Sequence, residues 1–149
     1  MYQQNGIQFY RRTNVVTADP GKLVIMCYEG AIDNLIIAKQ KYAEKKYEDK
    51  SRHINKAKDI IDELMCSLDF KKGGVIARNL ESLYNYMIRR ILLADANRSM
   101  DIIDEVVGML RELLSAWEEV FAKPEIELQA KAVRLDANSK QQVSGYMTM

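Results

Sequence analysis

This sequence has very little of the residue types that build metal centres and many catalytic sites. It contains one histidine, two cysteines and two prolines among its 149 residues. A metal site inside a helical bundle needs several inward-facing histidines and carboxylates, so we interpret His53 as a solvated surface residue. No serine or cysteine stands at a spacing that would pair it with His53 as nucleophile and base. The sequence therefore predicts no enzyme, no metal and no cofactor.

The two cysteines and the absence of a long apolar run indicate the cellular compartment of the protein. Cys27 and Cys66 both lie in apolar helical patterns, and a chain of this length buries a core without disulfides, so we expect buried, reduced thiols. No uncharged run is long enough to cross a bilayer. The first residues also lack the basic and apolar regions of an export signal. We therefore expect a cytoplasmic protein without membrane insertion.

Charge of either sign is not in excess overall but is unevenly placed. The chain has 22 basic and 21 acidic residues. Lys39–Lys58 holds eight basic and three acidic residues, whereas Ser99–Glu119 holds six acidic residues and one basic residue. A basic stretch is one mark of nucleic-acid binding, which would weaken steeply with salt. We favour a role in solubility and helix pairing, and predict no nucleic-acid partner.

Four segments repeat apolar residues at steps of three and four, as the buried stripe of a helix does. The predicted helices span residues 19–46, 51–69, 74–97 and 100–122. Short links between four helices favour an antiparallel up-and-down four-helix bundle, an all-α fold. The stripe of the third predicted helix consists of Ala77, Leu80, Tyr84, Met87, Ile91 and Ala94.

The expected helix ends follow from capping and breaking residues. Asp19 precedes a proline at the first helical position, where the missing N–H costs nothing. The charged stretch Tyr47–Ser51 reads as a link, and Gly73–Gly74 as a tight corner between two helices. Pro124 closes the last helix.

The domain organisation follows from these ends. Residues 1–123 form the bundle together with an N-terminal arm that is either mobile or docked. Residues 124–149 are expected to be a frayed C-terminal tail, partly helical or disordered.

The first helix is apolar on two sides. Besides its core stripe it carries a second stripe of Ile25, Tyr28, Ile32 and Ile36. A small domain rarely exposes a large apolar patch, so a second stripe suggests a surface that another polypeptide covers. The alternative is a central helix with both sides in the core. Of Tyr28, Tyr84 and Tyr86, we expect Tyr84 in the core and regard the other two as candidates for an interface.

Three stretches carry a distinctive order of residues. They are Met1-Tyr2-x-x-x-Gly6-Ile7-x-x-Tyr10, Asp19-Pro20-x-x-Leu23-Val24-x-Met26-x-Tyr28-x-Gly30-Ala31, and Lys72-Gly73-Gly74-x-Ile76-Ala77-x-Asn79-Leu80-x-x-Leu83-Tyr84-x-Tyr86-Met87-Ile88-Arg89-Arg90. In this order and spacing they resemble the FliS family of flagellar export chaperones. The late Trp117 also fits, and the resemblance ends before Pro124.

The resemblance implies a non-enzymatic cytoplasmic chaperone. Such a protein binds the C-terminal segment of flagellin, blocks its premature polymerisation and helps deliver it to the flagellar type III export gate. Ile7 and Tyr10 match residues of the family's N-terminal arm, which is implicated in docking at an export gate component and in covering the empty groove. The sequence leaves two states of the free protein open, a monomer and a homodimer.

The groove for flagellin is predicted from apolar residues outside the main stripes of the first and third helices. For each of these residues the alternative is a place in the core. The predicted groove residues are Ile25, Tyr28, Ile32, Ile36, Ile76, Leu83 and Tyr86.

Overall fold

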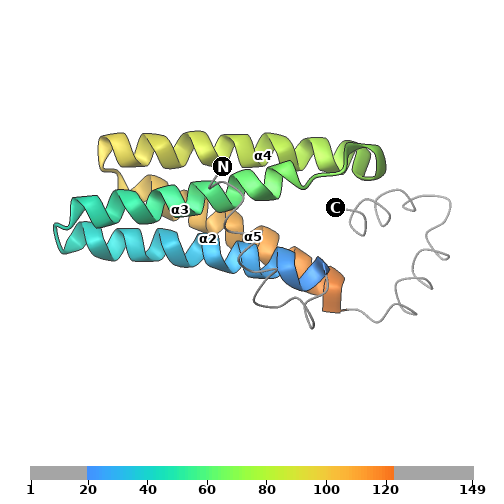
Figure 1. The fold of residues 1–149 in the computed structure, drawn as a ribbon, viewed down its shortest axis with the longest axis horizontal. Helices are drawn as coiled ribbons and strands as arrows, with labels where there is room; N and C mark the ends of the chain where they lie inside the picture. The colour runs from blue at the N-terminus through green and yellow to red at the C-terminus, as the bar shows by residue number, and fades with distance from the viewer. Residues whose placement is uncertain (1–19, 123–149) are drawn as a thin grey trace.

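The computed structural model describes residues 20–122, and these form four helices (Figure 1). Both the predicted arm, with Ile7 and Tyr10, and the predicted tail lie outside the described residues. The helices are α2 (Pro20–Ala43), α3 (Tyr47–Cys66), α4 (Phe70–Asn97) and α5 (Met100–Ala122).

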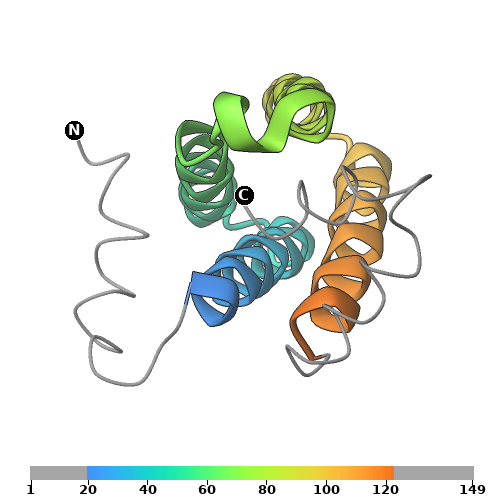
Figure 2. The same cartoon turned by 90° about the vertical axis from the view of Figure 1, so that its right-hand side faces the viewer.

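The helices form a closed ring in which each packs against two others. α2 contacts α3 and α5, and α4 contacts the same two helices from the opposite side of the core. Consecutive helices run in opposite directions, and the end-on view shows the four axes around one centre (Figure 2). The predicted all-α antiparallel bundle is confirmed. None of the described helices is long and apolar enough to cross a membrane.

The link between α2 and α3 is shorter than the sequence predicted. α2 ends at Ala43, and the stretch from Tyr47 onward is already the first turn of α3. Lys45 turns the chain with a φ of 62°, and the amide of Lys46 donates to the carbonyl of Lys41 over 2.8 Å. Glu48, in the first turn of α3, suits the positive end of the helix dipole, so charges that read as a link stabilise a helix start.

The glycine pair lies inside α4 instead of in front of it. Asp69 caps α4 by accepting a hydrogen bond of 3.0 Å from the amide of Lys72, so the helix starts at Phe70. Gly74 then leaves the helical region, with φ 52° and ψ −125°, and kinks the helix. A residue without Cβ adopts this conformation without strain. The predicted break is therefore a kink after one turn.

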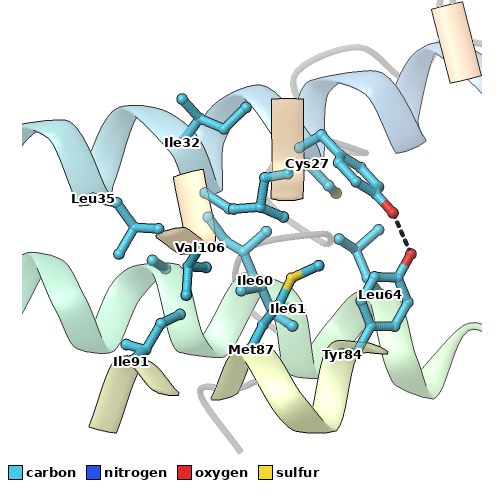
Figure 3. Close-up of a cluster of buried hydrophobic side chains, with 14 of the residues drawn as sticks. Cys27, Ile32, Leu35, Ile60, Ile61, Leu64, Tyr84, Met87, Ile91 and Val106 are labelled. Atoms are coloured by element: carbon cyan, nitrogen blue, oxygen red, sulfur yellow. Dashed lines mark hydrogen bonds between the residues drawn. The ribbon is translucent and has the colours of Figure 1, made fainter. Parts of the chain in front are cut away.

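The core occupies the centre of the ring, and side chains from all four helices meet there (Figure 3). The stripe predicted for the third helix is confirmed residue for residue, because its six members are the buried side chains of α4 apart from Gly73. Burying one such aliphatic or aromatic side chain contributes about 1.5–3 kcal/mol. The largest fully buried side chains include Tyr28, Leu35, Ile54, Ile61, Tyr84 and Leu110.

Candidate partner-binding face

The second stripe of the first helix is largely absorbed by the core. Tyr28 is fully buried and Ile32 is 6% exposed, whereas Ile25 and Ile36 are partly buried and pack against the core. This corrects the expectation that Tyr28 and Ile32 lie on an outer face. The reason is that α2 packs more closely against its two neighbours, α3 and α5, than α4 packs against the same two helices. Periodicity alone does not distinguish such a central helix from one with a free side.

Tyr28 has a structural partner across the core. Its hydroxyl lies 2.5 Å from the hydroxyl of Tyr84, which joins α2 to α4 (Figure 3). Burial raises the pKa of Tyr28 to about 12, against a smaller opposing effect of Tyr84 and Trp117. Burial also raises the pKa of Tyr84 well above its usual value. Both phenols stay protonated at neutral pH, and the pair ties two helices together without offering reactive chemistry.

The predicted residues of the third helix lie at the side of α4 that faces α5. The hydroxyl of Tyr86 donates to Glu105 over 2.6 Å, and Nε of Arg90 donates to the same carboxylate over 2.9 Å. These hydrogen bonds, that from Tyr86 first, lower the pKa of Glu105. Leu83, three residues before Tyr86, is 36% exposed, and Ile76 is partly buried.

α5 adds apolar side chains along the same seam. Met109 and Leu113 follow Glu105 at steps of four, which places them on the same side of the helix as Glu105. Both are partly buried and pack against the core. In antiparallel helices, moving back along α4 from Tyr86 corresponds to moving forward along α5 from Glu105. We call Ile76, Leu83, Met109 and Leu113 the α4–α5 strip.

The two helices separate along this seam. Figures 1 and 2 show α5 running obliquely, so that its end lies beside the start of α2 and away from the start of α4. Gly21 makes this approach close, because a Cβ there would stand 2.8 Å from the ring of Phe121. The Tyr86 and Arg90 contacts to Glu105 therefore mark the narrow end of the seam, and Ile76 lies toward its wide end.

Among residues 20–122, most of the exposed large apolar side chains belong to α4. Leu83 was predicted from the sequence as an exposed contact, whereas the four others, which also lie outside the core stripe of that helix, were not. The sequence contained a signal for these four residues, because they are large apolar residues that do not belong to the core stripe predicted for the third helix. The exposed large apolar side chains of α4 are Phe70 (42%), Val75 (64%), Leu83 (36%), Leu92 (43%) and Leu93 (41%).

The basic stretch is largely neutralised by ion pairs. Among them are Lys39–Asp104 at 2.5 Å, Arg52–Asp49 at 2.9 Å, Lys58–Asp62 at 2.8 Å and Lys50–Asp95 at 2.9 Å. Cations that are already paired present little net charge to a phosphate backbone. This pairing supports the expected role of the stretch in helix packing.

Lys50 is a feature that the sequence did not reveal. Lys50 is only 3% exposed. Besides its ion pair with the carboxylate of Asp95, its ammonium lies 3.4 Å from the carbonyl oxygen of Asp95. The hydroxyl of Ser51 donates to the carboxylate of Asp95 over 2.8 Å. A lysine in a charged stretch gives no signal of burial, since its depth depends on the end of α4 that packs over it.

The histidine and one cysteine differ from expectation in their burial. His53 is partly buried, and its Nδ1 lies 2.9 Å from Oδ1 of Asn34. Burial, followed by the charge of Lys56, lowers the pKa of His53. Cys27 is buried as expected, but Cys66 is exposed because it ends α3. Within residues 20–122, no three histidine, cysteine or acidic side chains group as a metal site would require.

Comparison with known proteins agrees with the resemblance. The family described as flagellar protein FliS matches residues 2–124. The flagellar secretion chaperone FliS of Salmonella typhimurium is 37% identical over 128 residues, which cover 83% of this chain and 95% of that protein. The FliS of Vibrio cholerae is 33% identical, with 78% and 89% covered, and that of Escherichia coli K12 is 30% identical, with 85% and 96% covered. The chain belongs to the FliS family of flagellar secretion chaperones.

Proposed function

We propose that this protein is a cytoplasmic chaperone that binds the C-terminal amphipathic segment of flagellin and prevents its premature polymerisation. It then escorts the bound flagellin to the flagellar type III export gate. Its curated relatives are flagellar secretion chaperones, and the function needs no catalysis. The observation that carries the proposal is the exposed apolar surface of α4, with Leu83 on the side that faces α5.

The physical mechanism is the docking of a helix on an apolar surface. A segment that is disordered when free loses conformational entropy on binding, and burial of its apolar side chains must offset that loss. The α4–α5 strip offers such side chains along one line, as helix-in-groove recognition requires. Ordering and release are equilibrium steps, so the chaperone needs no nucleotide.

We propose different roles for the predicted groove residues, according to how far each is buried. Ile76, Leu83 and Tyr86 on α4 are the proposed main contacts, extended by Met109 and Leu113 of α5. Ile25 and Ile36 are partly buried and are proposed as contacts at the edge of α2. Tyr28 and Ile32 support the surface from the core.

The N-terminal arm and the free state complete the proposal. Ile7 and Tyr10 are proposed to dock at an export gate component or to cover the groove before flagellin arrives. The free chaperone is a monomer or a homodimer, and sedimentation equilibrium distinguishes the two.

Two matched substitutions on one helix test the proposal. Leu83 and Leu92 are 36% and 43% exposed. Leu92 lies one turn before Asp95, which binds Lys50 of α3, and is therefore on the side of α4 away from α5. We expect Leu83→Asp to weaken binding of the host's flagellin C-terminal segment at least about tenfold, because an aspartate replaces about 1.5–3 kcal/mol of apolar burial. Leu92→Asp is expected to change the affinity less than about twofold, and isothermal titration measures both.

The circular dichroism spectrum and the melting temperature of each variant serve as controls. Both variants should keep the helical signal of the wild type. Equal affinities of the two variants, with both folded, would show that flagellin does not bind along the strip.

A further inference from the structure

We infer that the opposite charges of α4 and α5 fix the direction in which a guest helix lies on the α4–α5 strip. This inference rests on the proposed function and names a property of the guest. The favoured guest has an apolar stripe, acidic residues on the flank over α4 and basic residues on the flank over α5.

The two helices that border the strip differ in sign of charge. α4 carries five basic and two acidic residues, and α5 carries six acidic residues and one basic residue. The two acidic residues of α4 lie toward α3: Asp95 binds Lys50, and Glu81 lies on the same side of the helix, 14 residues earlier. Arg89 and Arg90, three and four residues after Tyr86, make the α4 border of the strip positive, and Glu105 and Glu112 make the α5 border negative.

Exposed charges on both borders of the strip are the ones that a guest would meet. Between α4 and α5, Arg90–Glu105 is the ion pair that the described residues form, at the narrow end of the seam. Arg78 and Arg89 on α4 and Glu112 on α5 are exposed. Arg89 lies three residues after Tyr86 and therefore on the side of α4 next to the strip, whereas Arg78 lies three residues before Glu81, on the side toward α3. Glu112 lies seven residues after Glu105, on the same side of α5.

Geometry converts this charge difference into a direction. A helix placed with its apolar stripe on the strip has one flank over α4 and the other over α5. Reversing its direction while keeping the stripe down exchanges the two flanks. A guest with acidic residues on one flank and basic residues on the other therefore matches the charges in one direction and opposes them in the reverse direction.

The expected preference is moderate because the charges are exposed. Each exposed pair changes an equilibrium by about 1.5- to 5-fold, so several pairs together favour the matching direction about tenfold. High salt should remove the preference, since the screening length falls to about 3 Å at 1 M ionic strength.

The test uses two synthetic amphipathic peptides of about 20 residues, which span about 30 Å as helices. They have the same composition and apolar stripe, but their acidic and basic flanks are exchanged. Each carries a fluorescent donor at its N-terminus. The acceptor is attached to Cys66 of the full chain, which is exposed at the end of α3, next to the start of α4, while Cys27 is buried.

We expect both peptides to bind, one with high and the other with low energy transfer. The variant Arg89→Glu/Glu112→Lys should exchange the two values, and 1 M salt should make them equal. The single variant Arg89→Glu, with circular dichroism as the check on folding, should reduce the difference in energy transfer between the peptides.

Two results would overturn the inference alone. One is that both peptides bind with equal energy transfer at low salt, and the other is that charge reversal leaves the two values unchanged. Failure of both peptides and of the host's flagellin segment to bind would overturn the proposed function as well.

Discussion

At the scale of single residues, two buried polar contacts connect α4 to other helices of the bundle. Tyr28 and Tyr84 link α2 to α4, and Lys50 and Asp95 link the start of α3 to the end of α4. Burial of apolar surface is not directional, so it specifies the register of packed helices less sharply than a polar contact does. A polar contact between fixed atoms favours one register, because every other register leaves a buried polar group without its partner.

The tyrosine pair should show strong coupling. Tyr28→Phe leaves the buried Tyr84 hydroxyl without this partner and is expected to lower the free energy of unfolding by about 1–3 kcal/mol. The double variant Tyr28→Phe/Tyr84→Phe removes both hydroxyls and should cost less than the sum of the two single changes. Urea unfolding of the four proteins measures the coupling. Additive effects would mean that the hydroxyls contribute independently.

The same pair predicts a loss of stability at alkaline pH. The pKa of Tyr28 is about 12 in the folded protein, and a free tyrosine has a pKa of about 10. The unfolded chain therefore loses its proton first, so the stabilisation is complete below pH 10 and is lost as pH rises toward 12. From Tyr28 we expect a loss of about 2 kcal/mol by pH 11.5.

The double phenylalanine variant is the control for this pH dependence. It should lose less stability between pH 9 and pH 11.5 than the wild type, in urea titrations at each pH. Identical slopes for the two proteins would contradict the assignment to the tyrosine pair.

For the Lys50–Asp95 pair, removing one partner should cost more stability than replacing both partners. Asp95→Ala leaves a buried ammonium, and we expect a loss of about 2–4 kcal/mol, since the Asp95 side chain is 25% exposed. Lys50→Met/Asp95→Leu should recover most of that loss, because no buried charge is left. Thermal and urea unfolding compare the two variants. A double variant as unstable as Asp95→Ala would show that the ion pair itself stabilises the fold.

At the scale of elements, the buried stripes were the most predictable feature. Ala77, Tyr84 and Ile91 are buried because their three- and four-residue steps follow the turn of the helix. The helix ends were less predictable. Whether Gly74 ends a helix or kinks it depends on the cap at Asp69, which holds an extra turn in front of it.

Two glycines predict opposite effects of the same substitution. Gly108 lies exposed in the interior of α5, and a Cβ added there would meet no atom within 4 Å, so Gly108→Ala should stabilise the protein by about 1 kcal/mol. Gly74 has a φ of 52°, so Gly74→Ala should destabilise it by about 1–3 kcal/mol. Urea unfolding gives both values. A destabilising Gly108→Ala would mean that this glycine has a packing role.

At the scale of the whole molecule, the ring arrangement decides which apolar surface is left over. α2 packs more closely against its two neighbours than α4 does, so Tyr28 and Ile32 of its second stripe enter the core. The end of α5 lies beside the start of α2 and away from the start of α4 (Figure 1). The side chains of the α4–α5 strip therefore stay partly exposed. The surplus apolar surface expected on the first helix is found mainly on α4.

Guest binding should raise the stability of the whole bundle. A ligand that binds only the folded state adds about 2.7 kcal/mol to the free energy of unfolding at a free concentration of one hundred times its Kd. We expect the host's flagellin segment to raise the melting temperature of the wild type by several degrees. It should leave Leu83→Asp almost unchanged at the same concentration. An equal shift in both proteins would place the binding site elsewhere.

The sequence by itself determined the four helices, their core stripes, the antiparallel order and the family. These properties depend on local periodicity, on short links and on residue patterns that can be read along the chain. Only the tertiary structure decided that Tyr28 and Ile32 are buried, that Lys50 is paired inside the bundle, and that α4 carries the exposed apolar side chains. The physical reason is that periodicity shows which faces of a helix are apolar, whereas burial depends on how closely the neighbouring helices pack against those faces.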